Sequence, residues 1–355
     1  MSRTGRCDIF SRFWAAFVTV CLLFCFAPLP AQAAGSGTAV IEALTGRVLY
    51  EENAQARLPM ASTTKIMTAL LTLEQPGLDE PFQVDDKAIL VEGTSMGLKQ
   101  GDTVTLRTLA AGMLLASGND AANAAAVRIS GSVAAFVEKM NQRAQELGLT
   151  DTHFETPSGL DGESHYSTPK DMALLAAAAL KNPEFVAICS QSSLRVEFGS
   201  PPGAITLYNH NRLLREYEGC IGVKTGFTKK AGRCLVSAAQ REGVTLICVT
   251  LGVYDDWNQH KRLLDRCFSM VSSRTLSPTL LPGILPVAGE GRSLSLSLQG
   301  EPVLPYIEGD PEPKEELFLP PFLYPSVQPG EAVGWVRWKV EGREVLRLPV
   351  IVKAG

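Results

Sequence analysis

The sequence predicts an α+β protein in which one sheet is closed by both ends of a domain, with a helical subdomain inserted and a small all-β domain after it. Two observations lead to this fold class. Strand-like runs occur near the start of the chain and again in its third quarter, with helix-like patterns between them. After residue 285 the pattern changes, and "SLSLSLQG" there alternates strictly between apolar and polar residues, which is typical of a strand with one buried face. The order of these patterns therefore indicates layers of helix on sheet.

Residues 1–33 have the composition of a secretory signal peptide. Three arginines precede an apolar run over 13–29, and the small residues of a cleavage site follow at Ala31 and Ala33. The run is short for a membrane span. We therefore expect cleavage before Ala34 and an exported, extracytoplasmic protein, located in the cell wall, in the periplasm or in the medium.

The charge of the mature chain argues against nucleic acid as a partner. Residues 1–33 hold three of the 33 basic and one of the 37 acidic residues, so the remaining chain has a net charge of about −6. Proteins that bind nucleic acid usually present a basic surface.

The elements of the first domain follow from their periodicity. A Gly-containing turn joins strands over 38–43 and 48–51, which predicts a hairpin. Helical patterns follow over 62–74, 106–116, 120–129, 132–147 and 169–180. Strands are predicted over 221–225, 233–239 and 244–251, and a last helix over 256–270.

Breaker residues divide the chain after this helix. "LSPTLLPGILPVAG" is typical of an interdomain linker, so we expect a first domain over 34–275, a linker over 276–285 and a β domain over 286–355. In the last of these, "SLSLSLQG", "AVGWVRWKV" and "VLRLPVIV" are predicted strands, and the proline-rich segment before the last two is predicted as loop.

Five cysteines remain in the mature chain, and none of them has the close spacing of a zinc knuckle or a redox pair. A disulfide between Cys220 and Cys234 and a set of buried free thiols are both compatible with the sequence.

The stretch "PMASTTKIMTALLTLE" sets a hydroxyl beside an amine. On a helix, Lys65 lies on the same face as Ser62, three residues earlier. Serine becomes a good nucleophile when a neighbouring base takes its proton. Lysine can be that base only when neutral, which burial and a second nearby cation would favour. Ser62 considered by itself also fits the cap of a helix.

A second copy of the same spacing, Ser167 to Lys170, has a structural explanation. Thr168 can cap a helix that has Pro169 at its first position and Asp171 where the acid of a capping box would lie.

Two further triplets add to the first motif. "LLASGNDAANAAA" places Ser117 and Asn119 in a turn between two predicted helices. "GVKTGFTKKAG" places Lys224 and Thr225 on a strand, where Gly226 leaves room for an extended substrate beside the sheet edge.

In this order, SxxK, SGN and KTG resemble the motifs of the serine-type D-alanyl-D-alanine carboxypeptidases, the low-molecular-weight penicillin-binding proteins. The likeness extends through "GTSMGLKQGDTVTLRTLAAGMLLASGNDAANAAA" and "TPSGLDGESHYSTPKDMALLA", and covers most of residues 38–270. It implies a β-lactamase/transpeptidase-like fold, with a mostly antiparallel sheet between helices. It also implies removal of the terminal D-alanine of peptidoglycan stem pentapeptides, inhibition by β-lactams, and a part in peptidoglycan biosynthesis, cell wall organisation and cell shape, without metal or cofactor.

The resemblance also assigns roles to residues. Ser62 would be the acylated nucleophile, with Lys65 as its base and Ser117 as a proton relay to the leaving D-alanine. The residues expected to bind substrate are Asn119, Lys224, Thr225, Gly226 and Phe227, the last through its backbone N–H in an oxyanion hole shared with Ser62.

The chain departs from the family pattern at three places. Phe227 stands where relatives often have His, and the stretch from Gly252 offers no Arg at its start to bind the terminal carboxylate. His210 lies near a position where relatives often carry a basic residue. The chain stops at "VIVKAG" directly after a predicted strand, so a C-terminal amphipathic membrane anchor is not expected.

Two alternatives share the fold. A serine β-lactamase of class A would need a Glu in an ExxxN setting between the second and third motifs, which is absent here. A non-catalytic wall-binding protein is disfavoured by three intact motifs. The four histidines form no HExxH pair and GxSxG is absent, so a zinc peptidase and an α/β-hydrolase lack their defining residues.

Overall fold

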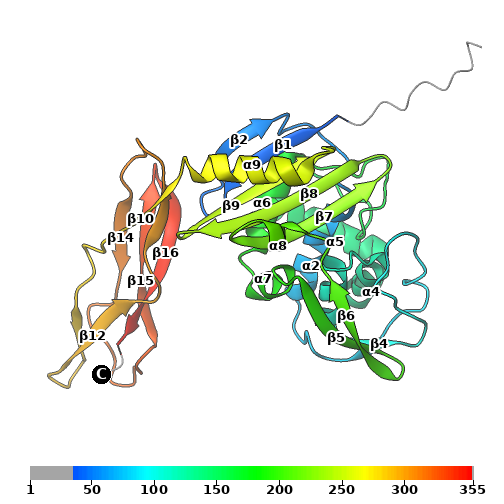
Figure 1. Ribbon diagram of the computed structural model, residues 1–355. Helices are drawn as coiled ribbons and strands as arrows, with labels where there is room; N and C mark the ends of the chain where they lie inside the picture. The colour runs from blue at the N-terminus through cyan, green and yellow to red at the C-terminus, as the bar shows by residue number, and fades with distance from the viewer. Residues whose placement is uncertain (1–34, 354–355) are drawn as a thin grey trace, which may run out of the picture. The chain divides into compact units, whose positions relative to one another are not determined.

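A five-stranded antiparallel sheet organises the first part of the chain in the computed structural model, which describes residues 35–353. The predicted signal peptide lies outside these residues. The first strand of the sheet pairs with the last one in sequence, so both ends of the domain share one sheet as predicted (Figure 1). In spatial order the strands are β2 (Val48–Glu52), β1 (Gly37–Glu42), β9 (Val244–Leu251), β8 (Gly232–Arg241) and β7 (Cys220–Thr228).

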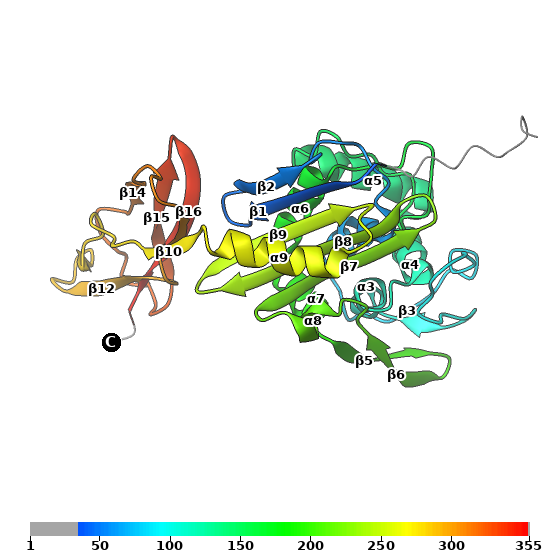
Figure 2. The ribbon, with the colours of Figure 1, turned by 45° about the horizontal axis from the view of Figure 1, so that its top comes forward.

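Helices cover both faces of this sheet. Helix α9 (Asp256–Phe268) lies along one face, and α2 and α6 lie behind the other (Figures 1 and 2). Successive strand residues point to opposite faces. Leu235 accordingly packs in the core beneath α9, whereas Val236 packs in the larger core of the helical subdomain. The predicted mostly antiparallel sheet between helices is confirmed.

The helical subdomain follows the predicted pattern closely. Its helices are α2 (Lys65–Leu73), α3 (Leu106–Leu114), α4 (Asn119–Ser130), α5 (Val133–Glu146), α6 (Pro169–Ala179) and α7 (Pro183–Cys189). Helix α7 was not predicted from the sequence. The helix predicted to start at Ser62 instead begins with the 3₁₀ turn η1 (Ala61–Thr64), and Ala61, at the start of this turn, has a positive φ of 48°.

A second sheet, also not predicted, flanks this subdomain. Its order is β3-β4-β5-β6, and a hairpin forms its longer half. The strands are β3 (Phe82–Gln83), β4 (Thr103–Val104), β5 (Ser193–Gly199) and β6 (Pro202–Tyr208). Nearly all of β6 is exposed, so its sequence lacks the buried alternation that predicts a strand. The short helix α8 (Leu213–Glu216) then leads into β7.

The second SxxK copy has the structural role that the sequence predicted. The Thr168 hydroxyl accepts a hydrogen bond from the N–H of Asp171 and so caps α6, which has Pro169 in its first turn. The Asp171 carboxylate does not complete a capping box, because it accepts hydrogen bonds from the Asp151 N–H and the Thr152 hydroxyl instead.

The last part of the chain is all-β, as predicted. One sheet has the order β11-β12-β16-β15-β14 around its own apolar core. The strands are β10 (Ser272–Thr275), β11 (Ile284–Pro286), β12 (Ser293–Leu298), β13 (Val303–Tyr306), β14 (Lys314–Phe318), β15 (Ala332–Val340) and β16 (Arg343–Val352). The segment predicted as loop before β15 therefore contains two strands, β13 and β14. The division at 276–285 stays a prediction, and β10, just before it, pairs with β13.

The cysteines of the described residues are all free thiols. The alternative disulfide between Cys220 and Cys234 is wrong, because in the β7–β8 register Cys220 lies opposite Ala239 while Cys234 lies opposite Gly226. These positions are too far apart along the ladder for an S–S bond.

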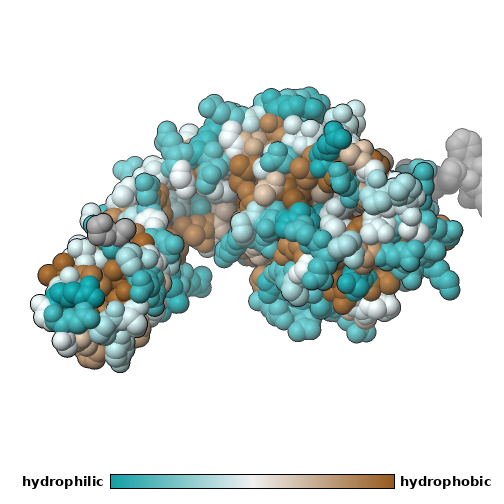
Figure 3. Space-filling model, turned by 90° about the horizontal axis from the view of Figure 1, so that it is seen from below, coloured by the Kyte–Doolittle hydropathy of each residue, from teal (hydrophilic) through white to brown (hydrophobic). Residues whose placement is uncertain are grey.

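Hydrophobic residues on the surface lie in patches between hydrophilic ones on the face shown in Figure 3. Over residues 35–353, no single helix has both the length and the apolar character needed to cross a membrane. Helices α6 and α7 meet those criteria only as a pair, with a bend of 108° between them.

Candidate active site

The turn that carries Ser62 is held by close backbone packing. Gly159 lies so near the turn that a Cβ atom there would come within 2.0 Å of the Ala61 carbonyl oxygen. The cap positions of η1 and α2 are Met60 and Thr64, and neither forms a side-chain cap. Ser62 is therefore not a helix cap, and its hydroxyl is instead hydrogen-bonded to Lys65.

The amine of Lys65 is fully buried among three oxygen atoms. Its Nζ lies 3.0 Å from Ser62 Oγ, 2.7 Å from Asn119 Oδ1 and 2.6 Å from the carbonyl oxygen of Ser158. Burial lowers the pKa of Lys65 well below its ordinary value, and the nearby Lys224 cation lowers this pKa further, while Asp120 raises it.

A neutral Lys65 would have its lone pair directed by these neighbours. A neutral amine has two N–H donors and one lone pair. The oxygens of Asn119 and Ser158 can only accept, so they take the two N–H groups. The lone pair is then left for the Ser62 hydroxyl, which is the arrangement that removes a proton from serine.

Ser117 and Lys224 form a second pair. Ser117 lies in the turn between α3 and α4 with a positive φ of 60°, and Lys224 Nζ is 3.0 Å from its Oγ. Lys224 Nζ also donates to the Thr225 carbonyl oxygen at 2.8 Å. Burial lowers the pKa of Lys224 to about 7. An ammonium has three donors, so its protonated form keeps one N–H for a ligand.

Strand β7 passes directly beside the η1 turn that carries Ser62, at Gly226. A Cβ atom built on Gly226 would lie 3.1 Å from the backbone nitrogens of Ser62 and Thr63. Two residues before it on β7, Lys224 lies on the same face of the sheet. The next side chain, Phe227, is 66% exposed, so its ring is directed to solvent.

Replacing Gly226 tests this close approach. Gly226→Ala is expected to slow acylation of Ser62 by about tenfold, because the added methyl group must push η1 and β7 apart by a few tenths of an ångström. Rapid-mixing kinetics with a chromogenic β-lactam would measure the rate. The exposed Gly203→Ala is the control, since a Cβ there meets no atom within 4 Å. Equal rates for both variants would contradict the expected crowding.

The buried acid Asp120 anchors the loop in front of this site. Its carboxylate accepts hydrogen bonds from the Ser95 hydroxyl and from the backbone N–H groups of 96–98. Next to it, Asn119 donates through Nδ2 to the Glu92 carbonyl oxygen at 2.7 Å while its Oδ1 faces Lys65. The SGN turn therefore fixes the loop over 92–98 at the edge of the site.

Two contributors were missed in the sequence. Ser158 acts through its backbone carbonyl, so its side chain gives no sequence signal. His165 is buried behind the turn and bonds to Thr64 Oγ1 at 2.8 Å. Both lie in "TPSGLDGESHYSTPKDMALLA", one of the stretches that carries the resemblance.

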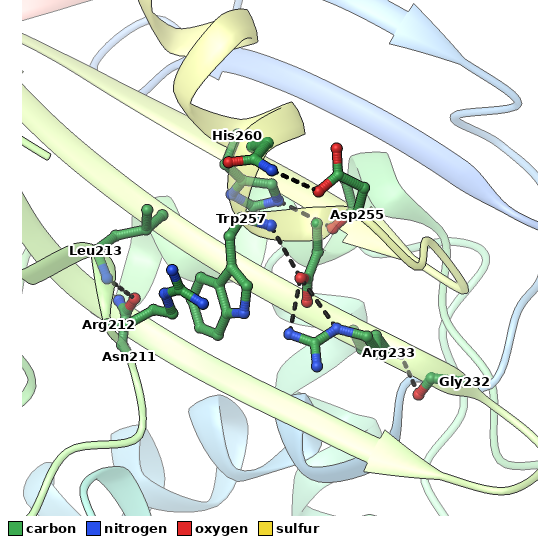
Figure 4. Close-up of polar contacts among 12 residues, drawn as sticks. Asn211, Arg212, Leu213, Gly232, Arg233, Asp255, Trp257 and His260 are labelled. Carbon is green, nitrogen blue, oxygen red and sulfur yellow. Dashed lines mark hydrogen bonds and ion pairs between the residues drawn. The ribbon is translucent and has the colours of Figure 1, made fainter. Parts of the chain in front are cut away.

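Two arginines lie close to the end of β7 but are already engaged. Arg233, opposite Phe227 in the register, donates through Nε and Nη2 to Asp256 Oδ1 at 3.0 and 2.8 Å. Its guanidinium and that of Arg212 lie 5.5 and 5.6 Å from the centre of the Trp257 ring (Figure 4). His210 is exposed, and its pKa is lowered by partial burial and by Lys224.

Comparison with known proteins agrees with this geometry. The family model described as D-alanyl-D-alanine carboxypeptidase matches residues 26–255, which include all three motifs. The chain belongs to the D-alanyl-D-alanine carboxypeptidase family. It is therefore a serine-type carboxypeptidase of the penicillin-binding class, and the assignment favours this enzyme over the β-lactamase and the non-catalytic alternative.

Individual members of the carboxypeptidase family extend the likeness beyond the motifs. The D-alanyl-D-alanine carboxypeptidase DacF of Bacillus subtilis is 32% identical over 88% of this chain and 84% of its own length. Penicillin binding protein 5 from Haemophilus influenzae is similar in structure, with a TM-score of 0.65, 27% identity, and coverage of 92% of this chain and 98% of that one. A DD-transpeptidase from Streptomyces covers 68% of this chain and all of its own, with a TM-score of 0.62 and 33% identity.

Proposed function

We propose that this carboxypeptidase removes the terminal D-alanine of peptidoglycan stem pentapeptides through an acyl-enzyme on Ser62, and that β-lactams inhibit it by acylating the same oxygen. The observation that carries the proposal is the buried Lys65 amine, 3.0 Å from Ser62 Oγ, with its other two neighbours both acceptors.

In the acylation step, Ser62 Oγ attacks the carbonyl carbon of the penultimate D-alanine while its proton moves to Lys65 Nζ. The oxyanion that forms is stabilised by the backbone N–H groups of Ser62 and Phe227. The close approach of Gly226 to the Ser62 nitrogen supports this pairing of the two amides. The C–N bond then breaks, and the proton that Lys65 took from Ser62 is relayed through the Ser117 hydroxyl to the departing amine, which leaves Lys65 neutral again. Water completes the cycle by attacking the ester, with Lys65 again as the base.

The terminal carboxylate of the substrate is held by Lys224 and Thr225. The protonated Lys224 has a donor to spare after its bonds to Ser117 and Thr225. No arginine is needed for this, and Arg233 and Arg212 are engaged with Asp256 and Trp257 as described. Asn119 supplies the remaining contact, through the second N–H of its amide to the peptide carbonyl.

Export is part of the proposal, because stem peptides lie outside the cytoplasm. Residues 1–33 provide the expected signal peptide.

The proposal is tested by D-alanine release from diacetyl-L-lysyl-D-alanyl-D-alanine. We expect release by the purified protein and its loss after preincubation with penicillin. Turnover of penicillin without D-alanine release would contradict the carboxypeptidase and favour a β-lactamase. Transfer of the acyl group mainly to added amino acids would favour a transpeptidase.

The rate should depend on pH in a bell shape. Lys65 must be neutral to act as the base, so kcat/KM should rise as the pH increases through the pKa of Lys65. Burial places this pKa well below the ordinary value for lysine. Lys224 must be charged to hold the carboxylate, and its pKa is about 7. Its charge is lost as pH increases through 7, so kcat/KM should fall above that value. A kcat/KM that stays constant from pH 7 to 9 would contradict this role for Lys224.

A further inference from the structure

The loop over 155–165 contacts the catalytic turn, which is η1 with Ser62, and α2 at several points. Its Pro157 carbonyl accepts a hydrogen bond from the buried Thr68 hydroxyl at 2.6 Å, and Gly159 packs on the Ala61 carbonyl. Between these two contacts, the Ser158 carbonyl reaches Lys65 Nζ. The loop therefore supplies one of the two acceptors that direct the lone pair of Lys65.

His165 joins this loop to the turn at its far end. Its Nδ1 accepts a hydrogen bond from the Glu155 N–H at 2.9 Å, so the ring proton lies on Nε2. Nε2 then donates to Thr64 Oγ1, 2.8 Å away. His165 is 4% exposed and Thr64 is fully buried. The imidazole therefore bridges the first residue of the loop and the residue that precedes Lys65.

The protonation state and the packing of His165 favour a ring that keeps both of its hydrogen bonds. Burial lowers the pKa of His165 to about 4, so the ring stays neutral over the pH range in which the enzyme would act. Its ring also lies edge-on to Phe154, with 6.1 Å between the ring centres. Both ring nitrogens are thus hydrogen-bonded and one ring edge is packed, so the ring has a single favourable orientation.

We propose that His165 is a positioning residue for the reaction: through Thr64 it holds the 155–165 loop against the catalytic turn, and so keeps the Ser158 carbonyl on Lys65. This rests on the proposed role of Lys65 as the base. Without the bridge, the carbonyl can withdraw, one N–H of Lys65 loses its acceptor, and the lone pair is no longer directed only at Ser62.

The base of the loop does not depend on this bridge. His153 and Tyr166 exchange backbone hydrogen bonds across the loop ends, and Ser167 does the same with Leu58. Variants at 165 should therefore fold, with the effect confined to the loop and the turn.

Three substitutions separate the two hydrogen bonds of the ring. His165→Gln places an amide N–H near Nε2 and keeps the donor to Thr64, whereas His165→Asn places an acceptor near Nδ1 and loses that donor. His165→Ala loses both. His260 is the matched control, because it is equally buried with both nitrogens bonded to hydroxyls, of Ser237 and Thr250, away from the three motifs.

The measurement is the rate of acylation by a chromogenic β-lactam as a function of its concentration, which separates binding from the chemical step. We expect the Ala and Asn variants to lower the maximal acylation rate at least tenfold with binding changed less than twofold, and Gln to restore the rate to within threefold of wild type. His260→Asn should lower the melting temperature without lowering the acylation rate of the folded protein.

Two results would overturn the inference. One is an unchanged acylation rate in all three variants at 165. The other is an equal loss in Ala, Asn and Gln that follows the fraction of unfolded protein, which would make the role of His165 purely structural. Absence of acylation in the wild-type protein would contradict the proposed function itself, and this inference with it.

Discussion

Ser62→Ala is expected to abolish D-alanine release, with a fall of at least about 10⁴-fold, while the protein stays folded. The substitution removes the oxygen atom that we propose forms the acyl bond. It leaves the packing of η1 unchanged, because the Ser62 hydroxyl caps no helix and, within residues 35–353, its side-chain hydrogen bond is to Lys65. Release of D-alanine would be followed by an enzyme-coupled assay, and folding by thermal unfolding.

The control for this variant is Ser193→Ala, at an exposed position on β5. It should keep the wild-type rate. D-alanine release by Ser62→Ala at a rate near that of this control would require another nucleophile.

Lys65→Met is expected to lower the acylation rate by about 10² to 10⁴-fold, although Ser62 is still present. Methionine has nearly the length of lysine but no proton acceptor for the serine. The change also leaves the oxygens of Asn119 and Ser158 without their donor, so some loss of stability accompanies it. Acylation would be measured by rapid mixing with a chromogenic β-lactam.

The second SxxK copy provides the control here. Lys170→Met alters the lysine of that motif, whose Thr168 caps the start of α6. It should acylate at the wild-type rate. If Lys65→Met did the same, a different group would have to be the base.

Much of the fold follows from local patterns in the sequence. The first hairpin, most of the helices and the three strands β7, β8 and β9 all have the periodicity of their class. The order of these patterns also predicted that both ends of the domain share one sheet, and the pairing of β1 with β9 agrees with this. The capping of α6 by Thr168 followed from the positions of Pro169 and Asp171.

The rest depends on contacts between distant residues. Ala61, at the start of η1, has a positive φ, and its carbonyl oxygen packs against Gly159, which is distant in the sequence. Neither feature has a local sequence pattern. The strands β3 and β4 are two residues long and have no readable period.

In the candidate site, too, some groups could be predicted from the sequence and others could not. The side chains that meet around Lys65 and Lys224 belong to the three motifs, and they could be predicted because each motif holds reactive groups at a recognisable spacing. The Ser158 carbonyl is a backbone atom, and any residue could provide it. The bond from His165 to Thr64 joins residues 101 apart in the sequence, so no local pattern predicts it.

The proposed mechanism requires that Ser62 carries the acyl group. Intact-mass spectrometry of the protein after exposure to penicillin, followed by peptide mapping, tests it most directly. We predict one added penicilloyl group on the peptide that contains Ser62 and none on the peptide that contains Ser167. An adduct on any other residue would contradict the proposed role of Ser62 as the nucleophile. So would the absence of an adduct while D-alanine release continues in the presence of penicillin.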